Sequence, residues 1–456
     1  ALTATQLAGL KSANIGALTT TQLAGITSTQ LGLLSTTQVG GLTSTEIGAL
    51  TTTQLAGVTS TGINALTSTQ AAGLTTTEIG ALTTTQMSGL KAASLTGMTT
   101  TQLGTFAATQ IGALSNTAVS GLTTTILSGL TTTQVGGLTS SQIAALVTAQ
   151  VQNLTSTQVG ALTTTQVGGL TSAQIGLLNT TQVGALTSTE LGALTTTQVL
   201  GFNTSAIAAL TTTQIGALSA TQLGALSTAQ AVNITSTNLG ALTTTQLAGL
   251  TATEIGVLTS TQASGFTTTQ IAALTATQAG GIKALALTGM TTTQLGSLGT
   301  TQIGGLSTTT VAGLTTTILS GLTTTQVGGF TATQIGAITT AQITSMTSTQ
   351  LGALTTTQVG GLTAAQVGAI TTTQAGGLTS TEIGALTTTQ LAGLKSANIA
   401  VLTTTQVGGL TAAQLGALTT TQVGGMTSTN LGALTTTQLA GLTAAQLAGG
   451  TAAHGG

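Results

Sequence analysis

The chain is built on a period of eight residues in which two large apolar positions recur. The first falls at residue 2 and every eighth residue after it, and it is Leu, Ile, Val, Met or Phe throughout. The second, five residues later, is Val, Ile, Leu or Met, with occasional Ala such as Ala71 and Ala231. Residues 2–449 thus hold 448/8 = 56 complete octads without an insertion. Such a repeat predicts one continuous solenoid over residues 1–449, followed by an atypical tail at 450–456.

The polar positions of the octad predict a short helix. Position 2 is mostly Thr, with Ser35, Ser115, Asn179 and Asn203 as substitutes, and these residue types cap helix N-termini. Position 5 is Gln or Glu in most octads and completes a capping box, while the apolar residues at positions 1 and 6 have the spacing of a hydrophobic staple. We expect a helical turn that starts at position 2 and ends near the small residues at positions 7 and 8, where Gly suits a C-cap.

A β-solenoid is the alternative fold, because Thr, Val and Ile favour strands and Gly pairs would form its corners. Thr and Gly are also mediocre helix formers. Positions 3 and 4, however, hold small residues and, apart from Leu285, essentially never a large apolar one. The apolar spacing of five then three also breaks the alternation of a strand. The pattern favours the solenoid of short helices.

The charged residues indicate which positions face solvent. All four Lys are at position 2 and all five Glu are at position 5, namely Lys11, Lys91, Lys283, Lys395, Glu46, Glu78, Glu190, Glu254 and Glu382. We therefore predict that positions 2 and 5 face water and that positions 1 and 6 face a core. The small residues at positions 7 and 8 are expected to let neighbouring backbones approach closely.

A longer repeat lies above the octad. The segment that starts at Met98 recurs from Met290, an offset of 290 − 98 = 192 residues, or 24 octads. The same offset relates Glu190 to Glu382. Tandem duplication of a block explains it. Because 24 is divisible by two, three and four, the offset leaves the number of octads per coil open.

The composition excludes several classes of partner. The net charge is -1 and Asp, Arg and Cys are absent, so the chain lacks the basic surface that binds nucleic acid or anionic membranes. Without Cys, neither disulfides nor thiolate metal sites form. No stretch approaches the ~18 apolar residues of a membrane span, and no signal-peptide pattern follows Ala1. The chain lacks an initiator Met, so we expect a mature product or an excerpt of a longer chain.

No residue is predicted to be catalytic, cofactor-binding or metal-binding. Active-site loops usually interrupt a scaffold, and this repeat has no interruption. The only His, His454, lies in the tail without partners and is expected to be solvated. Paired carboxylates, phosphate loops and metal-ligand clusters are missing. Asn179, Asn203 and Asn233 match the glycosylation acceptor pattern, which chance explains in a Thr-rich chain. We predict that the protein is not an enzyme and uses no cofactor.

The repeating LTTTQVGAL/LTSTQIGAL consensus covers essentially the whole chain. It resembles the octapeptide tracts of very large secreted or surface proteins of Gram-negative bacteria, which are adhesin-like. The resemblance implies an extracellular or cell-surface stalk, fibre or coat, and it carries over no functional residues.

The functional hypothesis is an extracellular structural repeat protein that forms a rod, fibre, filament or sheath by stacking on copies of itself. A near-neutral surface offers little charge repulsion between copies. The alternative is an adhesin stalk, or a binding protein whose Thr array recognises ice or a polysaccharide. Nucleic acid and membrane insertion are not expected, and a surface ligand is not identified.

Overall fold

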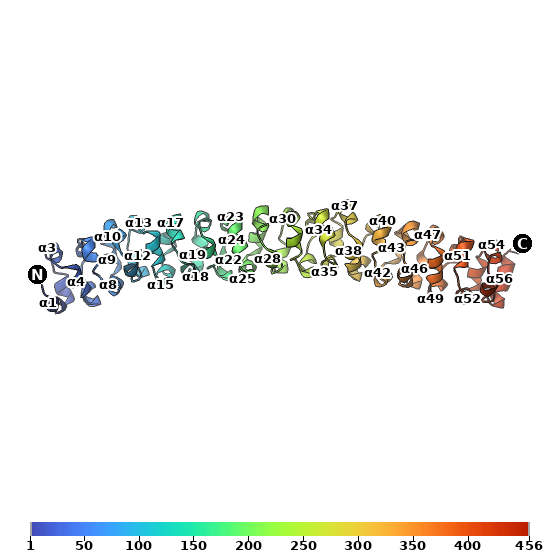
Figure 1. Cartoon of the computed structure of the whole chain (residues 1–456), viewed down its shortest axis with the longest axis horizontal. Coiled ribbons are helices and arrows are strands. Elements are labelled where there is room, and N and C mark those ends of the chain that lie inside the picture. Colours follow the sequence, from blue (N-terminus) through green and yellow to red (C-terminus); the bar gives the residue numbers. More distant parts are fainter. Residues whose placement is uncertain (1, 455–456) are drawn as a thin grey trace. The chain divides into compact units, whose positions relative to one another are not determined.

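Each octad forms one short helix in the computed structural model, which describes residues 2–454 (Figure 1). Helix n begins at residue 8n − 4, the third position of its octad, from α1 (Ala4–Ala8) to α56 (Ala444–His454). The described residues contain no strand. The helical prediction is confirmed, the β-solenoid alternative is wrong, and the protein is a helical repeat solenoid.

The helices before α56 are four to six residues long. They are four residues long in α2, α5, α6, α7, α11, α20, α21, α27, α28, α29, α31, α32, α33, α36, α41, α44 and α55. They are six residues long in α8, α10, α16, α19, α22, α23, α24, α25, α26, α30, α34, α35, α38, α40, α42, α43, α46, α47 and α48, and five in the remainder. Helices this short are not stable alone, so each depends on its cap and its neighbours.

The predicted capping box starts most of the helices. Ahead of α21 (Thr164–Val167), the Thr163 hydroxyl accepts the Gln166 N–H at 3.3 Å, and the Gln166 Oε1 accepts the Thr163 N–H at 2.8 Å. The helix ends at Gly168 as expected, but its φ is −60° and no described glycine has a positive φ. Gly is therefore not used here as a left-handed C-cap.

Three octads make one coil within each compact part of the chain. A helix packs mainly on the helices three before and three after it, as α21 does on α18 (Ser140–Ala144) and α24 (Ser188–Ala193). Helices α22 (Ser172–Leu177) and α25 (Thr196–Gly201) show the same relation in Figure 1. The long sequence repeat of 24 octads therefore corresponds to 24/3 = 8 coils. The structure thereby fixes the number of octads per coil, which the sequence left open.

Positions 1 and 6 form the core, as predicted. Val167 and Leu170 are buried, and so are the four Phe side chains at position 1. Small residues bring neighbouring coils together: a Cβ on Gly57 would overlap the backbone of Ser28 in the preceding coil. The close approach predicted for the small residues is confirmed there.

The chain divides into two compact units, Ala1–Leu226 and Ser227–Gly456. Each unit is a stack of three-octad coils. The prediction of one uninterrupted solenoid over residues 1–449 stays a prediction. In the tail, α56 continues the helix as far as His454.

Candidate functional site

The fifth position of the octad is buried, so the prediction that it faces water is wrong. Gln166 is 3 % exposed, and Glu46, Glu78, Glu190, Glu254 and Glu382 are buried as well. The prediction that position 2 faces water is confirmed for the four Lys residues, which are all exposed. Position 5 is polar because its side chain bonds to buried backbone groups.

The position-5 Gln bridges two successive coils. Its Oε1 completes the capping box of its own helix, and its Nε2 donates to the preceding coil. The Gln166 amide donates to the carbonyls of Val135 at 2.8 Å and Leu138 at 2.7 Å, which lie 31 and 28 residues earlier. Gln86 repeats the arrangement with Leu55 at 2.7 Å and Val58 at 2.8 Å. One side chain thus bonds three backbone groups, of which the Val135 carbonyl also accepts the Leu138 N–H at 3.0 Å.

The nearer of the two carbonyls, that of Leu138 or Val58, depends most on this side chain. It belongs to position 1 of an octad in the preceding coil, just before the N-cap, and it receives no backbone N–H. Shorter polar residues at position 5 reach the equivalent carbonyl: Ser94 donates to Leu66, Thr310 to Ile282, Asn398 to Ile370 and Asn430 to Leu402, at 2.7–2.9 Å. Gln, Ser, Thr and Asn therefore make the same bond.

One octad shows a substitute for the missing donor. Position 5 is Ala206, which cannot bond the position-1 carbonyl of Leu178 in the preceding coil. In the same octad, position 2 is Asn203 instead of Thr, and its Nδ2 donates to Leu178 at 3.1 Å. Its Oδ1 still caps the helix by accepting the Ala206 N–H at 2.8 Å. The paired change restores the bond to the neighbouring coil.

The five Glu residues keep the capping box of their own helix but lack the amide that donates to the preceding coil. One carboxyl oxygen completes the capping box, as when Glu254 Oε2 accepts the Thr251 N–H at 2.6 Å. The other oxygen takes the place of the donating amide, and Oε1 of Glu46, Glu78 and Glu254 is buried without a partner among the described residues. Burial raises the pKa of the Glu254 and Glu382 carboxyls, against hydrogen bonds from Thr251 and Thr379 that lower it.

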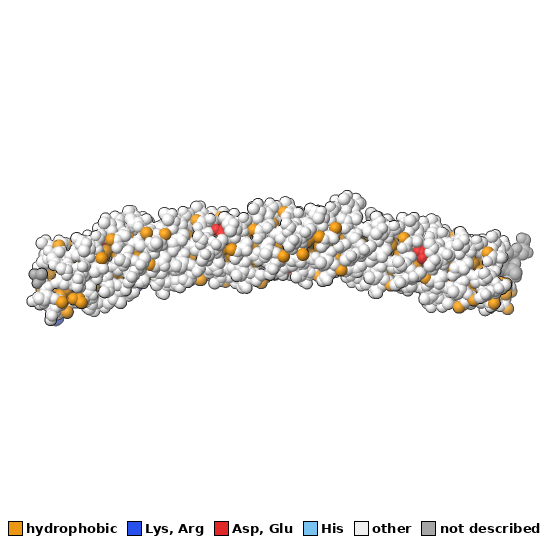
Figure 2. All heavy atoms as spheres, in the orientation of Figure 1, with side chains coloured by type: hydrophobic (Ala, Val, Ile, Leu, Met, Phe, Trp, Pro, Cys, Tyr) orange, Lys and Arg blue, Asp and Glu red, His pale blue; other side chains and the backbone are white. Residues whose placement is uncertain are grey.

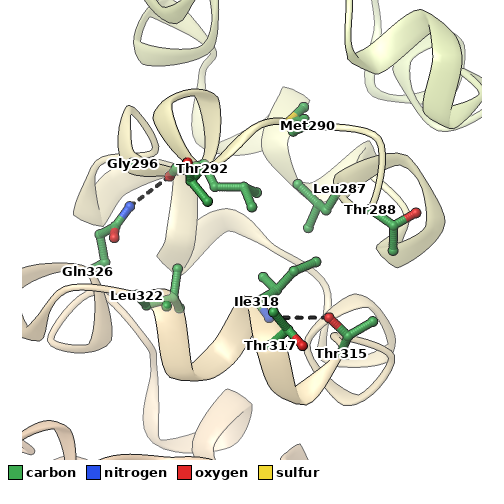
Figure 3. Close-up of a pocket in the computed structure, with 12 residues that line it drawn as sticks. Leu287, Thr288, Met290, Thr292, Gly296, Thr315, Thr317, Ile318, Leu322 and Gln326 are labelled. Carbon is green, nitrogen blue, oxygen red and sulfur yellow. Dashed lines mark hydrogen bonds between the residues drawn. The ribbon is translucent and has the colours of Figure 1, made fainter.

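Two octads have Ile at position 5, and each opens a pocket between coils. Ile318 lies in α40 (Thr316–Gly321) and borders a pocket of about 280 Å³ with Leu287, Met290 and Leu322 (Figure 3). Ile126 in α16 (Thr124–Gly129) borders one of about 180 Å³. Both Ile side chains are half-buried. The pockets lie where a Gln amide would otherwise join the coils.

The two pockets are equivalent. Every residue that lines the smaller one has a counterpart in the larger one at the offset of the long repeat, such as Met98 with Met290 and Ile126 with Ile318. No charged side chain lines either pocket. In the octad after Ile318, Gln326 keeps its bond to the Leu295 carbonyl at 2.8 Å (Figure 3). The loss of the bridge is therefore local to the Ile octad.

The structure gives the glycosylation candidates structural contacts. Asn179 caps α23 (Thr180–Ala185) by accepting the Gln182 N–H at 2.9 Å, and Asn233 donates to the Ala229 carbonyl at 2.8 Å. The side chain of His454 lies outside the described residues. No group of three or more His, Cys, Asp or Glu that could hold a metal occurs in the part of the chain that the structure describes.

No helix within the described range is long and apolar enough to cross a membrane. The predictions that the protein is not an enzyme and uses no cofactor stay predictions.

Sequence reasoning missed the bridge because it treated Glu at position 5 as a sign of exposure. The available signal was the uneven variation of the polar positions. Positions 3 and 4 exchange Thr, Ser and Ala freely, whereas position 5 returns to Gln in most octads. A polar residue held so constant indicates a bonded side chain rather than a solvated one.

Comparison with known proteins supports the repeat and little beyond it. The family model of the ALTTAQ repeat matches residues 144–172, 161–188, 188–220 and 380–412. No curated protein matches the sequence. Among solved structures, the leucine-rich repeat-containing protein LegL7 from Legionella pneumophila aligns at 12 % identity over 65 % of this chain and 80 % of that chain, with a TM-score of 0.11. This chain is therefore a tandem repeat tract similar to the ALTTAQ repeat over the matched residues.

Proposed function

We propose that the protein is an extracellular structural repeat protein that assembles by stacking its coils on those of other copies. The observation that carries the proposal is the direction of the bridge. Each coil offers Gln amides to the coil before it and backbone carbonyls to the coil after it, as Gln166 and Leu138 do. A coil from a second copy has the same two faces, so the contact repeats without closing on itself.

The donating face is visible where a coil has no described coil before it. Gln6 and Gln22 complete their capping boxes at 2.8 Å, and their exposed amides reach no carbonyl among the described residues. A coil that stacks there, from the same chain or from a second copy, would supply the position-1 carbonyls that Gln residues such as Gln166 reach.

The surface is compatible with association between copies. The chain has nine charged side chains in 456 residues, and the face in Figure 2 shows few charged atoms and scattered apolar ones. Charge repulsion between copies is therefore small. The resemblance of the repeat consensus to tracts of bacterial surface proteins supports a cell-surface or secreted location, where a fibre, sheath or stalk would act.

Sedimentation velocity over a range of concentrations, with electron microscopy of the same samples, tests the assembly. We expect end-to-end species that grow with concentration. Gln6→Ala with Gln22→Ala removes two donor side chains and should weaken association about thirtyfold, since each neutral hydrogen bond contributes about 1 kcal/mol. Thr20→Ala, at an exposed position of α3 (Thr20–Ala24), is the matched control. A monomer at all concentrations contradicts the proposal.

A binding protein with a Thr array is the second candidate. It is favoured by the exposure of successive Thr residues, such as Thr163, Thr164 and Thr165 around the start of α21. In the octads of α18 and α24, which stack on α21, the corresponding residues are Thr139, Ser140 and Ser141, and Thr187, Ser188 and Thr189. Hydroxyl side chains therefore repeat from coil to coil within the unit, although Ser replaces the central Thr. Ice-recrystallisation and insoluble-polysaccharide pull-down assays test this candidate. Results equal to buffer in both assays would rule it out.

A further inference from the structure

We propose that the two pockets bordered by Ile126 and Ile318 each bind a small, neutral aromatic molecule that carries one N–H or O–H donor. The inference does not depend on assembly of the protein. It combines three features of the pockets, namely their free acceptor, their apolar walls and their lack of charge.

The free acceptor is a position-1 carbonyl. In the consensus octad the Gln amide donates to this carbonyl of the preceding coil, as Gln166 does to Leu138. The equivalent carbonyl is that of Met290 for Ile318 and that of Met98 for Ile126. Among the described residues no donor reaches either carbonyl. Met98 and Met290 are buried residues that line the two pockets, so a ligand donor that reaches the carbonyl gains a bond that the protein itself does not make.

The walls indicate an aromatic body. Leu287, Ile318 and Leu322 line the larger pocket together with Met290, and Met98 occupies the same place in the smaller pocket. A Met thioether packs favourably against an aromatic ring and adapts to its shape. Two of the five Met residues of the chain are thus placed at these two pockets.

The volume and the uncharged lining of the pockets restrict the class of ligand further. The volumes of about 280 and 180 Å³ lie below the range of roughly 300–1,000 Å³ that drug-sized ligands occupy. A single or fused ring fits this space. Since no charged side chain lines either pocket, a charged ligand would lose its hydration without a counter-charge.

The packing of the neighbouring helices is consistent with an open space beside Ile318. Helices α37 (Thr292–Gly296) and α40 flank the larger pocket and pack less closely than the other helix pairs that stack within the same unit. Leu295 of α37 is half-buried, whereas most residues at position 6 are fully buried. The space beside Ile318 is thus open between two coils.

Indole is a suitable probe, because it is a neutral fused ring with one N–H. The chain has no Trp and no Tyr, so indole fluorescence is read without a protein background. We expect a saturable blue shift of emission and two sites per chain by equilibrium dialysis. 1-Methylindole, which lacks the donor, should bind about fivefold to tenfold more weakly, as expected for one neutral hydrogen bond. Equal affinity of the two compounds, or no saturable binding of indole, would overturn the proposal.

Replacing each Ile with the Gln of the consensus octad tests whether the two pockets are the binding sites for indole. Ile318→Gln should reduce the stoichiometry from two to one, and Ile126→Gln with Ile318→Gln should abolish binding. These variants introduce the residue found in most octads, and unfolding curves confirm that they fold. Leu285→Gln makes a similar change at a side chain that is 71 % exposed, and it should leave both sites intact. Two sites remaining in the double variant would contradict the assignment.

Discussion

The coils around Gln166 and around Ile318 share their octad length, helix start and buried apolar positions, yet they differ in how they join the preceding coil. Gln166 donates to two carbonyls of that coil, those of Val135 and Leu138. Ile318 satisfies none, and a pocket of about 280 Å³ lies beside it. The fold therefore tolerates loss of the bridge at one octad, because positions 1 and 6 still supply the core.

The comparison separates two roles within the octad. Apolar positions 1 and 6 and the small residues at positions 7 and 8 define the coil, whereas position 5 decides whether a coil is fully bonded to the coil before it. Gln makes the full bridge, Glu keeps the capping half, and Ile has neither half. Changes at position 5 should thus alter the stability of a coil contact without changing the fold.

Loss of the bridge in a consensus coil is expected to have the largest effect. Gln166→Leu leaves the Leu138 carbonyl without a donor, which costs about 1–3 kcal/mol. It also removes one of the two bonds to the Val135 carbonyl, which keeps the bond from the Leu138 N–H, and this loss costs about 1 kcal/mol. The local free energy of unfolding should fall by about 2–4 kcal/mol. Native-state hydrogen exchange of amides between residues 131 and 170 measures the change.

The control for Gln166→Leu is Thr164→Ala in the same helix. Thr164 is exposed, and Ala is common at position 3 of other octads. Its effect should stay within about 0.5 kcal/mol. Equal protection factors in the two variants would mean that the bridge does not stabilise the coil contact.

Crowding of the coil contact should have the next largest effect. Gly57→Ala places a Cβ against the backbone of Ser28 in the preceding coil, so overpacking should cost about 1–3 kcal/mol. Gly80 lies within α10 (Thr76–Ala81) and has open space at the same atom. Gly80→Ala should instead stabilise by up to about 1 kcal/mol through helix propensity. Chemical denaturation of both variants tests whether the sign differs as expected.

How much of this was predictable from the sequence depends on the distance over which each feature acts. The N-cap at position 2, the capping box and the buried positions 1 and 6 follow from residues within one octad, and they were predicted, although the helix itself begins one residue later, at position 3. The role of Gln166 was not, because its acceptors Val135 and Leu138 lie 31 and 28 residues away in sequence. That spacing has meaning only once the coil is known to contain three octads.

The pockets show the same limit. Ile126 and Ile318 are visible in the sequence as departures from Gln, and the long repeat relates them. That their octads open a space between coils depends on contacts with Met98 and Met290 of the preceding coil. The octad pattern describes neither contact, because the two Met residues occupy ordinary apolar positions.

A Gln in place of Ile at position 5 should restore the bridge and moderately increase the stability of the coil contact. Ile318→Gln supplies a donor for the Met290 carbonyl and should raise the local free energy of unfolding by about 1–2 kcal/mol. Hydrogen exchange in residues 287–321 measures it. Ile318→Leu keeps the size of the side chain without a donor and should give no gain. A loss of stability in Ile318→Gln would show that the packing of the Ile side chain stabilises this octad more than the hydrogen bond of a Gln side chain does.

The pH dependence of the Glu octads is expected to give the smallest effect. Burial raises the pKa of the Glu254 and Glu382 carboxyls in the folded chain. Since the folded-state pKa lies above that of the unfolded chain, folding favours the protonated form. This stabilisation is complete below the ordinary carboxyl pKa of about 4.3 and is lost as the pH rises through the raised pKa. The free energy of unfolding should therefore be higher at acidic than at neutral pH.

Glu254→Gln combined with Glu382→Gln separates this effect from other titrations. The amide supplies the donor that the ionised carboxylate lacks, so each substitution should add about 0.5–1.5 kcal/mol at pH 8. The variant should also lose part of the acid stabilisation, because two protons are no longer taken up on folding. Thermal unfolding at several pH values compares the two proteins. If the parent chain were instead more stable at pH 8 than at pH 4, the buried carboxyls would have to be stabilised as anions, and the contrast between Gln and Glu octads would fail.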